Sequence, residues 1–483
     1  MALDWTLTIY VVNFFLALSI VFLERRRPSW VFVWILVLFF LPWVGFFLYI
    51  IIGRRPSLRR KRALENARME RSIIEGVLSD RGDIVLDPDC GRSGAAREFD
   101  SLVRMLQVSR SFLTCGNRVR IITEGPEKYD LLLGDIRNAR HHVHLEYFVI
   151  RDDEMGRKVL SALIGKARQG VEVRLLFDDV GGRPSPFTLR SLKEAGGRYE
   201  RFFPSYIPVI RWLNLNINYR NHRKIAVIDG RIGYVGGFNI GDEYIGKNTK
   251  LGHWRDTHLR IEGRATFALQ LRFMLDWNYA SEAEGRMKPS ASYFPELAEE
   301  DGAAIQIVSS GPLRRQELIQ ESFLKMIASA RRSINIQTPY FIPDKSIMDL
   351  LRIAALSGVE VRIMVPRRKD QVLVHWASAS YLGELLYDGV KVYYYEDGFL
   401  HSKTITVDGK MVSIGSANWD IRGFRLDFET NAVVYDEEVG MKHDRIFEED
   451  LKNCSELTTE MYHHRGLEPR IKESLSRLAS PIL

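Results

Sequence analysis

The sequence predicts an α/β protein built from two pseudo-symmetric halves that pack together, preceded by an N-terminal hairpin of two transmembrane helices. Three observations carry this prediction. A His-x-Lys-x-x-x-x-Asp pattern occurs twice, at His222 and at His401, with glycine and asparagine following at matching offsets. The pentapeptide Gly-Val-Glu-Val-Arg also occurs twice, at 170–174 and 358–362, and two long runs without a formal charge open the chain. Such internal self-similarity indicates a duplicated structural unit.

Residues 1–53 form the expected hairpin. Its spans, about residues 5–23 and 30–52, are each long enough to cross a bilayer core of about 30 Å at about 1.5 Å per residue. A cleaved signal peptide would begin with basic residues and end at a small-residue cleavage site, and the first span has neither. Pro42 and Gly45 are expected to kink the second span, which transmembrane helices tolerate.

Basic residues after the second span set the expected topology. Six of them stand between residues 54 and 62, against three arginines in the loop between the spans. The positive-inside bias therefore places both termini and both halves in the cytosol. The same cluster can contact anionic head groups, where each charge contributes about 1 kcal/mol. Residues 54–115 are interpreted as a basic juxtamembrane linker.

Each half is expected to run strand, helix, strand, helix, hairpin, with the first half at 116–290 and the second at 291–483. This order favours a sheet with helices on its faces. Asp-Gly pairs at Asp229 and Asp408 predict the hairpin turns. We expect the halves to pack face to face around a pseudo-twofold axis. A C-terminal helix, with Ile471, Leu475 and Leu478 on one face, is expected to cover the core.

The repeated pattern places histidine and lysine two residues apart near the start of a strand, so that both side chains point to one face. An imidazole beside an ammonium group supplies a nucleophile or acid next to an anion clamp, which is what a phosphodiester requires. Aspartate before glycine is also typical of a tight turn. The sequence therefore leaves open whether Asp229 and Asp408 contact a substrate or shape the loop.

On these residues the chain resembles the phospholipase D superfamily: two H-x-K-x-x-x-x-D motifs, with Gly236-Gly237-x-Asn239 and Gly415-Ser416-x-Asn418 behind them. With the N-terminal hairpin and the stretch Pro-Tyr-Phe-Ile-Pro at 339–343, it is similar to the bacterial cardiolipin synthases of that superfamily. The resemblance implies two phospholipase D-like halves with no cofactor and no metal. It implies that one phosphatidylglycerol transfers its phosphatidyl group to another through a phosphohistidine, giving cardiolipin and glycerol.

The resemblance also assigns residues. The implied catalytic set is His222, Lys224, Asp229, His401, Lys403 and Asp408. By analogy His222 is the nucleophile, and His401 is the general acid and later the base. Asn239 and Asn418 would hold the non-bridging oxygens together with the two lysines. Asp256 and Glu429 would orient the imidazoles, and Glu146 and Gln337 would support the pocket. One imidazole must start neutral and its partner protonated, which predicts a bell-shaped rate profile.

The expected partners are phosphatidylglycerol, cardiolipin and an anionic membrane surface, with no nucleic acid. The expected location is the bacterial inner membrane, with several spans and the catalytic part in the cytosol. The net charge of +7 and the pI near 9.1 suit anionic partners without separating lipid from nucleic acid. Cys90, Cys115 and Cys454 are few, odd in number and far apart, so neither a disulfide framework nor a cysteine metal site is expected.

Several alternatives remain open. A membrane-anchored phospholipase D would hydrolyse phospholipids to phosphatidic acid, a nuclease would cut nucleic-acid diesters, and a scaffold would not be catalytic. The hairpin argues against a nuclease, and two intact motifs argue against a scaffold. Residues 241–247 imitate a phosphate-binding loop, but Asn248 stands where Ser or Thr would bind magnesium. The histidines at 141–144 are interpreted as the entry to a strand rather than as a metal site.

Overall fold

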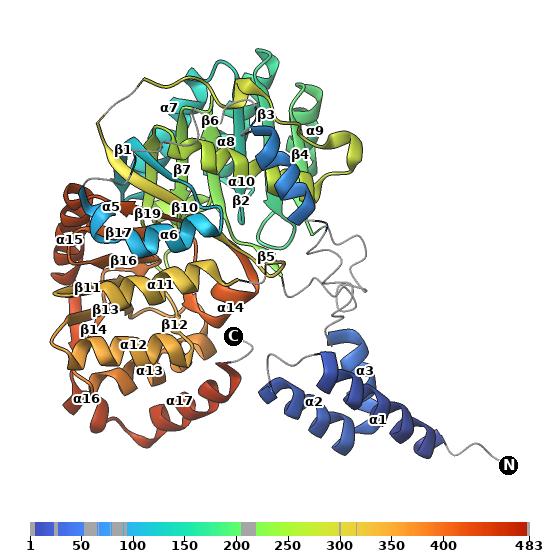
Figure 1. Cartoon of the computed structure of the whole chain (residues 1–483), viewed down its shortest axis with the longest axis vertical. Coiled ribbons are helices and arrows are strands. Elements are labelled where there is room, and N and C mark those ends of the chain that lie inside the picture. Colours follow the sequence, from blue (N-terminus) through green and yellow to red (C-terminus); the bar gives the residue numbers. More distant parts are fainter. Residues whose placement is uncertain are drawn as a thin grey trace. The chain divides into compact units, whose positions relative to one another are not determined.

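The computed structural model describes residues 5–23, 28–52, 65, 67–77, 79, 90, 94–203, 219–298, 301–314 and 316–480. The chain divides into two compact units, Met1–Met69 with Phe203–Asn218, and Glu70–Phe202 with Tyr219–Leu483. Helices α1–α3 belong to the first unit, and both motif-bearing halves belong to the second (Figure 1). The basic cluster at 54–62 and the loop arginines at 25–27 lie outside the described residues.

The first unit contains α1 (Trp5–Leu23), α2 (Pro28–Phe40) and α3 (Pro42–Ile52). The break between α2 and α3 confirms the kink expected at Pro42, whose ring leaves no N–H for a helical hydrogen bond. Position 45 has room only for glycine, because a Cβ there would lie 2.6 Å from the carbonyl oxygen of Val37, which is too close. Asn13 of α1 donates to the carbonyl oxygens of Leu38 and Pro42, at 3.2 and 2.9 Å, and so satisfies the Leu38 acceptor, which has no N–H partner at Pro42.

Among the described helices, none is both long enough and apolar enough to cross a membrane.

The second unit is organised around one sheet with the order β20-β14-β13-β11-β16-β17-β19-β10-β1-β9-β7-β6-β2-β3-β4, and β5 pairs with β19 off this path. The strands of the first half are β1 (Leu113–Ile122), β2 (His142–Tyr147), β3 (Glu172–Asp178), β4 (Arg198–Phe202), β5 (Arg220–Asn221), β6 (Lys224–Ile228), β7 (Ile232–Gly236), β8 (Trp254–Arg255) and β9 (His258–Glu262). Those of the second half are β10 (Ala303–Ser310), β11 (Ser333–Gln337), β12 (Phe341–Ile342), β13 (Glu360–Pro366), β14 (Lys391–Tyr395), β15 (Phe399–Leu400), β16 (Thr404–Val407), β17 (Met411–Gly415), β18 (Trp419–Asp420), β19 (Asp427–Tyr435) and β20 (Cys454–Leu457).

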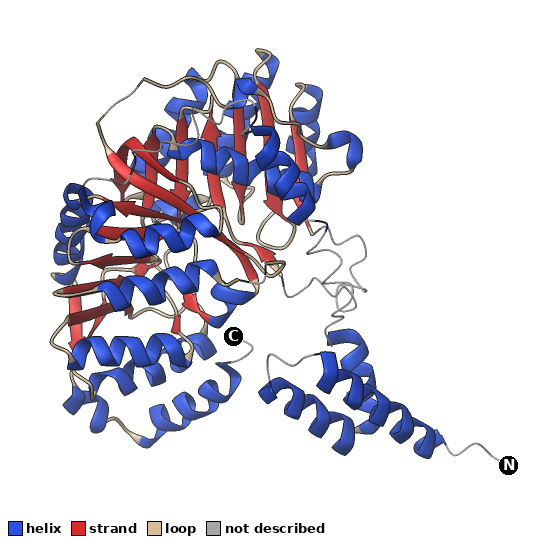
Figure 2. Ribbon diagram, in the orientation of Figure 1, coloured by secondary structure: helices blue, strands red, loops and turns tan. Residues whose placement is uncertain are grey.

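The two halves repeat one topology, as the duplicated motifs predict. Strands β2, β3 and β4 are parallel, and the hairpin β6–β7 lies antiparallel on the other side of β2. Strands β11, β13 and β14 with the hairpin β16–β17 reproduce this arrangement. The strands run between helices in Figure 2. The expectation of an α/β fold in two related halves is confirmed.

Helices surround this sheet. In the first half they are α7 (Gly125–Asn138), α8 (Glu154–Arg168), α9 (Pro186–Glu194) and α10 (Ala265–Ala280), with the short 3-10 helices η2 (Asp242–Ile245), η3 (Ala283–Gly285) and η4 (Ala291–Tyr293). In the second half they are α11 (Leu318–Ser329), α12 (Lys345–Leu356), α13 (Val372–Leu386), α14 (Ile421–Arg425), α15 (Glu437–Leu451), α16 (Thr459–His463) and α17 (Leu467–Ala479). A core shared by both halves joins Ile225 and Leu259 to Val412 and Val434, so the halves fold against one another.

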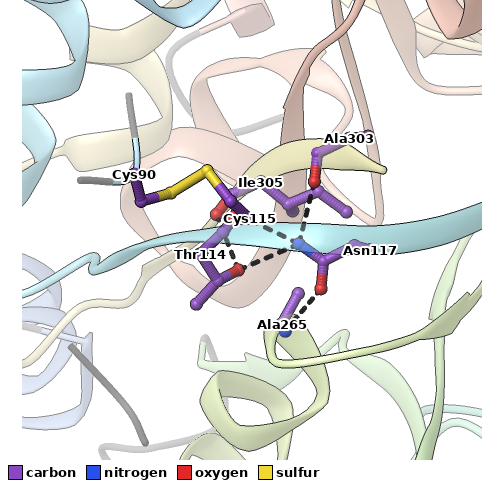
Figure 3. The surroundings of a disulfide bond; sticks show 7 residues. All are labelled: Cys90, Thr114, Cys115, Asn117, Ala265, Ala303 and Ile305. Atoms are coloured by element: carbon purple, nitrogen blue, oxygen red, sulfur yellow. Dashed lines mark hydrogen bonds between the residues drawn. A yellow bond between two sulfur atoms is a disulfide. The ribbon is translucent and has the colours of Figure 1, made fainter. Parts of the chain in front are cut away.

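The sheets of the two halves are joined edge to edge by β1, and β7 and β9 also contact β17 and β19 through the shared core, so the halves pack face to face as expected as well. Leu113 and Thr114 pair with β10, and Arg118–Ile122 pairs with β9. Where β1 changes partner, the Asn117 amide donates to Ala303 at 3.0 Å and accepts from the Ala265 N–H at 2.8 Å (Figure 3). The helices α5 (Gly94–Glu98) and α6 (Asp100–Val108) also contribute buried side chains to the core of the second half, although they lie in the range interpreted as a linker.

Cys90 and Cys115 form a disulfide, with their Cα atoms 5.6 Å apart (Figure 3). This corrects the expectation that the cysteines form none. The number and spacing of the cysteines could not show this pairing, because it depends on where β1 places Cys115 in the fold. Cys454 is a free thiol and is half-buried.

Helix α17 also corrects an expectation. Ile471, Leu475 and Leu478 share one face as predicted, but they are 50%, 63% and 80% exposed. The buried side chains of this helix are those of Glu473 and Ser476. The face that packs on the protein is therefore the polar one, and the apolar face points away from it.

Candidate active site

Each motif histidine is held by backbone from the other half. The short strand β5 pairs with β19, and the N–H of His222 donates to the carbonyl oxygen of Phe428 at 3.0 Å. In the same way β15 pairs with β8, and the N–H of His401 donates to Arg255 at 2.7 Å. This exchange of strands brings both motif segments to the junction of the halves.

The two expected orienting acids are also exchanged between the halves. His222 Nδ1 lies 2.8 Å from Glu429 Oε1, and His401 Nδ1 lies 2.6 Å from Asp256 Oδ2. Both carboxyl groups are fully buried, while the imidazoles keep 13% and 11% of their side-chain surface exposed. An acid bound to Nδ1 leaves Nε2 as the nitrogen that can react. In each imidazole, Nε2 is therefore the ring nitrogen that does not contact the acid.

An aromatic ring contacts each imidazole. The Phe148 ring centre lies 5.0 Å from that of His222, and the Trp254 ring centre lies 5.0 Å from that of His401. Sequence reasoning did not select either aromatic residue. Both stand within two residues of a selected acid, Glu146 or Asp256, and that proximity was the only available signal.

Lys224 and Lys403 are fully buried, and each donates to the carbonyl oxygen of its own motif histidine. Burial lowers the pKa of Lys224 to about 7 and that of Lys403 to about 8, although Glu429 and Asp256 favour the charged forms. Lys403 also lowers the pKa of His222, and Lys224 lowers that of His401. All four groups therefore belong to one electrostatic site.

The acids of the two pairs differ in protonation. Burial raises the pKa of Glu429 to about 8, against the effect of Lys224. Burial also raises the pKa of Asp256, but Lys403 and His401 outweigh it and leave that pKa below its ordinary value. The pKa values of His222 and His401 are lowered, chiefly by burial, to well below 6.5 and to about 4. The carboxyl beside His222 therefore holds its proton more tightly than the carboxyl beside His401.

A glycine and a serine give the two acids different hydrogen-bond partners, and each partner lowers the pKa of its acid. The hydroxyl of Ser416 donates to Glu429 Oε2. At the equivalent position Gly237 has no side chain, and a Cβ there would lie 1.9 Å from Asp256 Oδ1. That oxygen instead accepts the N–H of Thr257 at 2.7 Å. Burial and the two lysines lower the pKa values of both imidazoles, so the pKa values do not single out one ring as the protonated partner.

The motif aspartates lie elsewhere. Asp229 accepts the backbone N–H groups of residues 140–142 at 2.8–2.9 Å, and Asp408 accepts those of 331–333 at 2.7–2.9 Å. Both adopt positive φ, of 54° and 55°, at the hairpin turns. Asp229 follows β6, about 15 Å along the strand from Lys224. Of the two roles left open by the sequence, the geometry favours the structural one.

The two asparagines are not equivalent. Asn239 is buried, with Oδ1 accepting the Val149 N–H at 3.1 Å and Nδ2 lying 3.1 Å from the Tyr244 hydroxyl. Its amide is thus used in the protein interior. Asn418 is half-buried, and among the described residues its Oδ1 has no hydrogen-bond partner. Of the pair, only Asn418 presents a free oxygen.

Glu146 and Gln337 act on the strands that carry the histidines. Glu146 accepts the side-chain N–H of Asn221, the residue before His222, at 2.7 Å. Gln337 donates to Asp450 at 2.7 Å, and Asp450 in turn binds Arg255 through two hydrogen bonds of 2.9 and 2.7 Å. Both residues therefore support the pocket indirectly.

Two buried arginines were missed by sequence reasoning. Arg223, between the motif histidine and lysine, donates to Asp276 at 2.7 Å and to the carbonyl oxygen of Ser310 at 2.8 Å. Arg255 and Asp450 form the corresponding pair beside His401. An arginine inside the motif was a visible signal for the first pair. The second pair joins residues 195 apart in sequence and had no such signal.

The histidines at 141–144 and the segment 241–247, which resembles a phosphate-binding loop, both have structural roles. His142 and His144 lie in β2, which confirms the strand interpretation. In the segment 241–247, Asp242 accepts the N–H of Met155 at 2.9 Å and Lys247 pairs with Glu154 at 2.6 Å. Within the described part of the chain, no group of three histidine, cysteine or acidic side chains is placed to hold a metal ion.

Comparison with known proteins shows what the chain is similar to. The family model described as the phospholipase D-like domain of cardiolipin synthase matches residues 132–257 and 323–451, and a phospholipase D-nuclease N-terminal model matches 11–54. The chain is 46% identical to the major cardiolipin synthase of Bacillus subtilis over 481 residues, 98% of each chain. It is 45% identical to cardiolipin synthase 2 of Staphylococcus epidermidis over 477 residues, 98% of this chain and 96% of that one. The crystal structure of phosphatidylserine synthase from Haemophilus influenzae shares the fold, with a TM-score of 0.61 at 14% identity, covering 79% of this chain and all of that one.

Proposed function

The chain belongs to the cardiolipin synthase family of the phospholipase D superfamily, and from this membership we propose that it joins two phosphatidylglycerol molecules into cardiolipin and releases glycerol. It is a phosphatidyltransferase, and phosphatidylglycerol is both donor and acceptor. The observation that carries the proposal is the pair of Nε2 atoms oriented by exchanged acids, because such a pair can attack a phosphodiester and protonate its leaving group in one site.

The proposed reaction proceeds in two steps. His222 Nε2 attacks phosphorus, the bond from phosphorus to the glycerol oxygen breaks, and His401 supplies the proton to that oxygen. His401 then takes the proton of the hydroxyl of the second phosphatidylglycerol, whose oxygen displaces His222 from phosphorus. Lys224 and Lys403 stabilise the negative charge on the non-bridging oxygens in both transition states. The side-chain oxygen of Asn418 is a hydrogen-bond acceptor, so it contacts a part of the substrate other than these anionic oxygens.

The assignment of His222 as nucleophile follows from the two acids. An attacking imidazole must be neutral, and burial together with Lys224 and Lys403 lowers the pKa of His222 well below 6.5, so this ring is neutral near pH 7. A general acid needs a stabilised imidazolium, and the carboxylate of Asp256 stabilises it on His401. A bound phosphodiester brings one further negative charge, which raises the pKa of His401 toward the value needed for proton donation.

The proposal includes a membrane anchor. Helices α1–α3 expose many large apolar side chains, among them Phe14 at 62%, Phe32 at 67% and Phe40 at 70%. Contiguous apolar surface of this kind is a sign of membrane or protein contact. We place these helices in the bacterial inner membrane as a two-span hairpin, with the catalytic unit in the cytosol by the positive-inside bias.

The test is product analysis with purified protein in vesicles of labelled phosphatidylglycerol. We expect cardiolipin and glycerol in equal amounts. Phosphatidic acid as the main product would instead establish the hydrolytic phospholipase D. Acid-free trapping followed by peptide mass analysis should find the phosphatidyl group on His222, and finding it on His401 would reverse the assigned roles.

A further inference from the structure

Helix α17 carries an apolar stripe that points away from the protein. Its four members, Leu467, Ile471, Leu475 and Leu478, are 72%, 50%, 63% and 80% exposed. At about 100° per residue they fall within an arc of about 80°, opposite the buried side chains of this helix. A helix that packs on its own protein through polar residues and exposes its apolar ones presents a surface for another partner.

Basic side chains flank this stripe on both sides. Arg470 and Arg477 lie on one edge of it and Lys472 on the other. Lys472 lies 5.4 Å from the ring centre of Trp376, and Arg477 lies 4.3 Å from that of Tyr381, both in α13. Cations at the border between apolar and polar faces are typical of helices that lie in a membrane interface.

A cleft of about 360 Å³ lies between α13 and the segment α16–α17, on the side of α17 that faces the protein. Its lining includes Arg367, Lys369, Trp376 and Arg465. The ammonium group of Lys369 lies 4.1 Å from the Trp376 ring centre and, among the described residues, pairs with no carboxylate. Burial and the nearby Lys472 and Arg367 lower the pKa of Lys369. Its neighbours Arg367, Arg465 and Lys472 pair with Glu396, Glu473 and Glu468, so Lys369 is the cation of this group without a carboxylate partner among the described residues.

The start of α13 extends the surface. Val372 and Leu373 are 62% and 55% exposed. Together, residues 367–376 and 465–478 contain seven basic and three acidic side chains, so the surface is cationic. An identical surface on a second copy would be repelled by it, whereas an anionic lipid surface would be attracted.

We propose that α17 and the start of α13, named here the docking face, bind the surface of an anionic phospholipid bilayer, with the apolar stripe among the acyl chains and the basic side chains that flank it at the level of the head groups. The docking face lies in the same compact unit as the active site. Asp370, on the loop before α13, accepts the hydroxyl of Tyr340, and its charge partly offsets the lowering of the Lys403 pKa by burial. Docking would hold the catalytic pocket at the level of the lipid head groups, independently of the N-terminal anchor.

The test uses the full chain in proteoliposomes. An environment-sensitive fluorophore is attached at Leu475→Cys in a Cys454→Ser background, and the matched control carries it at Ser161→Cys, an exposed position of α8. In phosphatidylglycerol vesicles, we expect the emission at 475 to shift to the blue and to be quenched by spin-labelled acyl chains, while that at 161 does neither. Equal behaviour at both positions would overturn the proposal.

Two further arms separate the causes. The double variant Lys369→Gln, Lys472→Gln should lower the docked fraction in phosphatidylglycerol vesicles, by roughly 30-fold in the docking equilibrium, because each charge near an anionic surface changes it about fivefold. An unchanged fraction, or equal docking on phosphatidylcholine vesicles, would overturn the role of charge. A blue shift in detergent that grows with protein concentration would assign the face to a second copy of the chain. The readout needs no turnover, so a negative result would leave the proposed reaction standing.

Discussion

At the scale of single residues, the two imidazoles differ in the acid that each contacts, and this difference predicts unequal effects of neutral substitutions. Asp256→Asn removes the negative charge that stabilises a protonated His401, and we expect kcat to fall by about 10²- to 10⁴-fold. Glu429→Gln replaces a carboxyl whose pKa burial raises to about 8, so it removes less negative charge near pH 7, and we expect a fall of less than about tenfold. Steady-state kinetics on phosphatidylglycerol measures both.

The order of these two effects is the sharp part of the prediction. If Glu429→Gln were the more damaging substitution, the acid and nucleophile roles would have to be exchanged. Ser416→Ala serves as the control for the Glu429 substitution. Removal of the hydroxyl that donates to Glu429 should change kcat less than Asp256→Asn does, because the carboxyl keeps its hydrogen bond with His222.

The lysines predict the alkaline side of the pH profile. The charge of Lys224 is present below its pKa of about 7 and is lost as the pH rises through that value, and Lys403 follows at about 8. Because the ammonium groups stabilise the phosphoryl oxygens, kcat/KM should fall as the pH rises from about 7 to about 8. Lys224→Arg keeps its charge at every such pH, so the alkaline fall should move upward to the value set by Lys403.

A profile of kcat/KM against pH checks this shift. Lys158→Arg, on the exposed side of α8, is the matched substitution and should leave the profile unchanged. The acidic side should lie below 6.5, because the pKa values of both histidines are lowered. An alkaline limb that stays in place in Lys224→Arg would mean that Lys224 does not act through its charge.

At the scale of elements, the motif aspartates predict a loss of stability without a loss of chemistry. Asp408 accepts three backbone N–H groups at the entry to β11, and Asp408→Ala leaves them without that partner. We expect a destabilisation of about 2–3 kcal/mol. The folded fraction should keep kcat within about tenfold of the original, because the carboxylate lies at the far end of β16 from Lys403.

Denaturant unfolding and kinetics on the same preparation separate the two effects. Asp130→Ala, an exposed position of α7, should change the free energy of unfolding by no more than about 0.5 kcal/mol. A loss of kcat by several orders of magnitude in a stably folded Asp408→Ala would show that the aspartate does take part in the reaction.

Elements were predictable from the sequence where local signals were strong. The Asp-Gly turns, the duplicated pentapeptides and the break at Pro42 all appear at the expected positions because turn chemistry and proline act within a few residues. The role of α17 was not predictable in this way. The spacing of its apolar residues showed that they share one face of the helix. It did not show whether that face packs on the protein or points away from it.

At the scale of the whole molecule, the long-range pairings could not be predicted from the sequence. The motifs indicated which histidines and acids belong to the site, yet each histidine takes its acid from the other half. The same holds for β1, which joins the halves, and for the disulfide between Cys90 and Cys115. These contacts depend on how the two halves pack together, and no pattern of neighbouring residues in the sequence predicts that packing.

The exchange of strands and acids predicts that catalysis requires both halves but not the connection between them. A protease site introduced between Ala298 and Asp301 allows the folded protein to be cleaved there. The pairing of β1 with β10 and the core shared by both halves should hold the fragments together, so we expect activity to stay within about twofold of the uncleaved protein. Fragments separated in denaturant should each be inactive after refolding, because each lacks the acid that orients its histidine, and mixing them should restore activity. Product formation by either fragment alone would show that one histidine and its own half suffice, which the crossed geometry of the site does not allow.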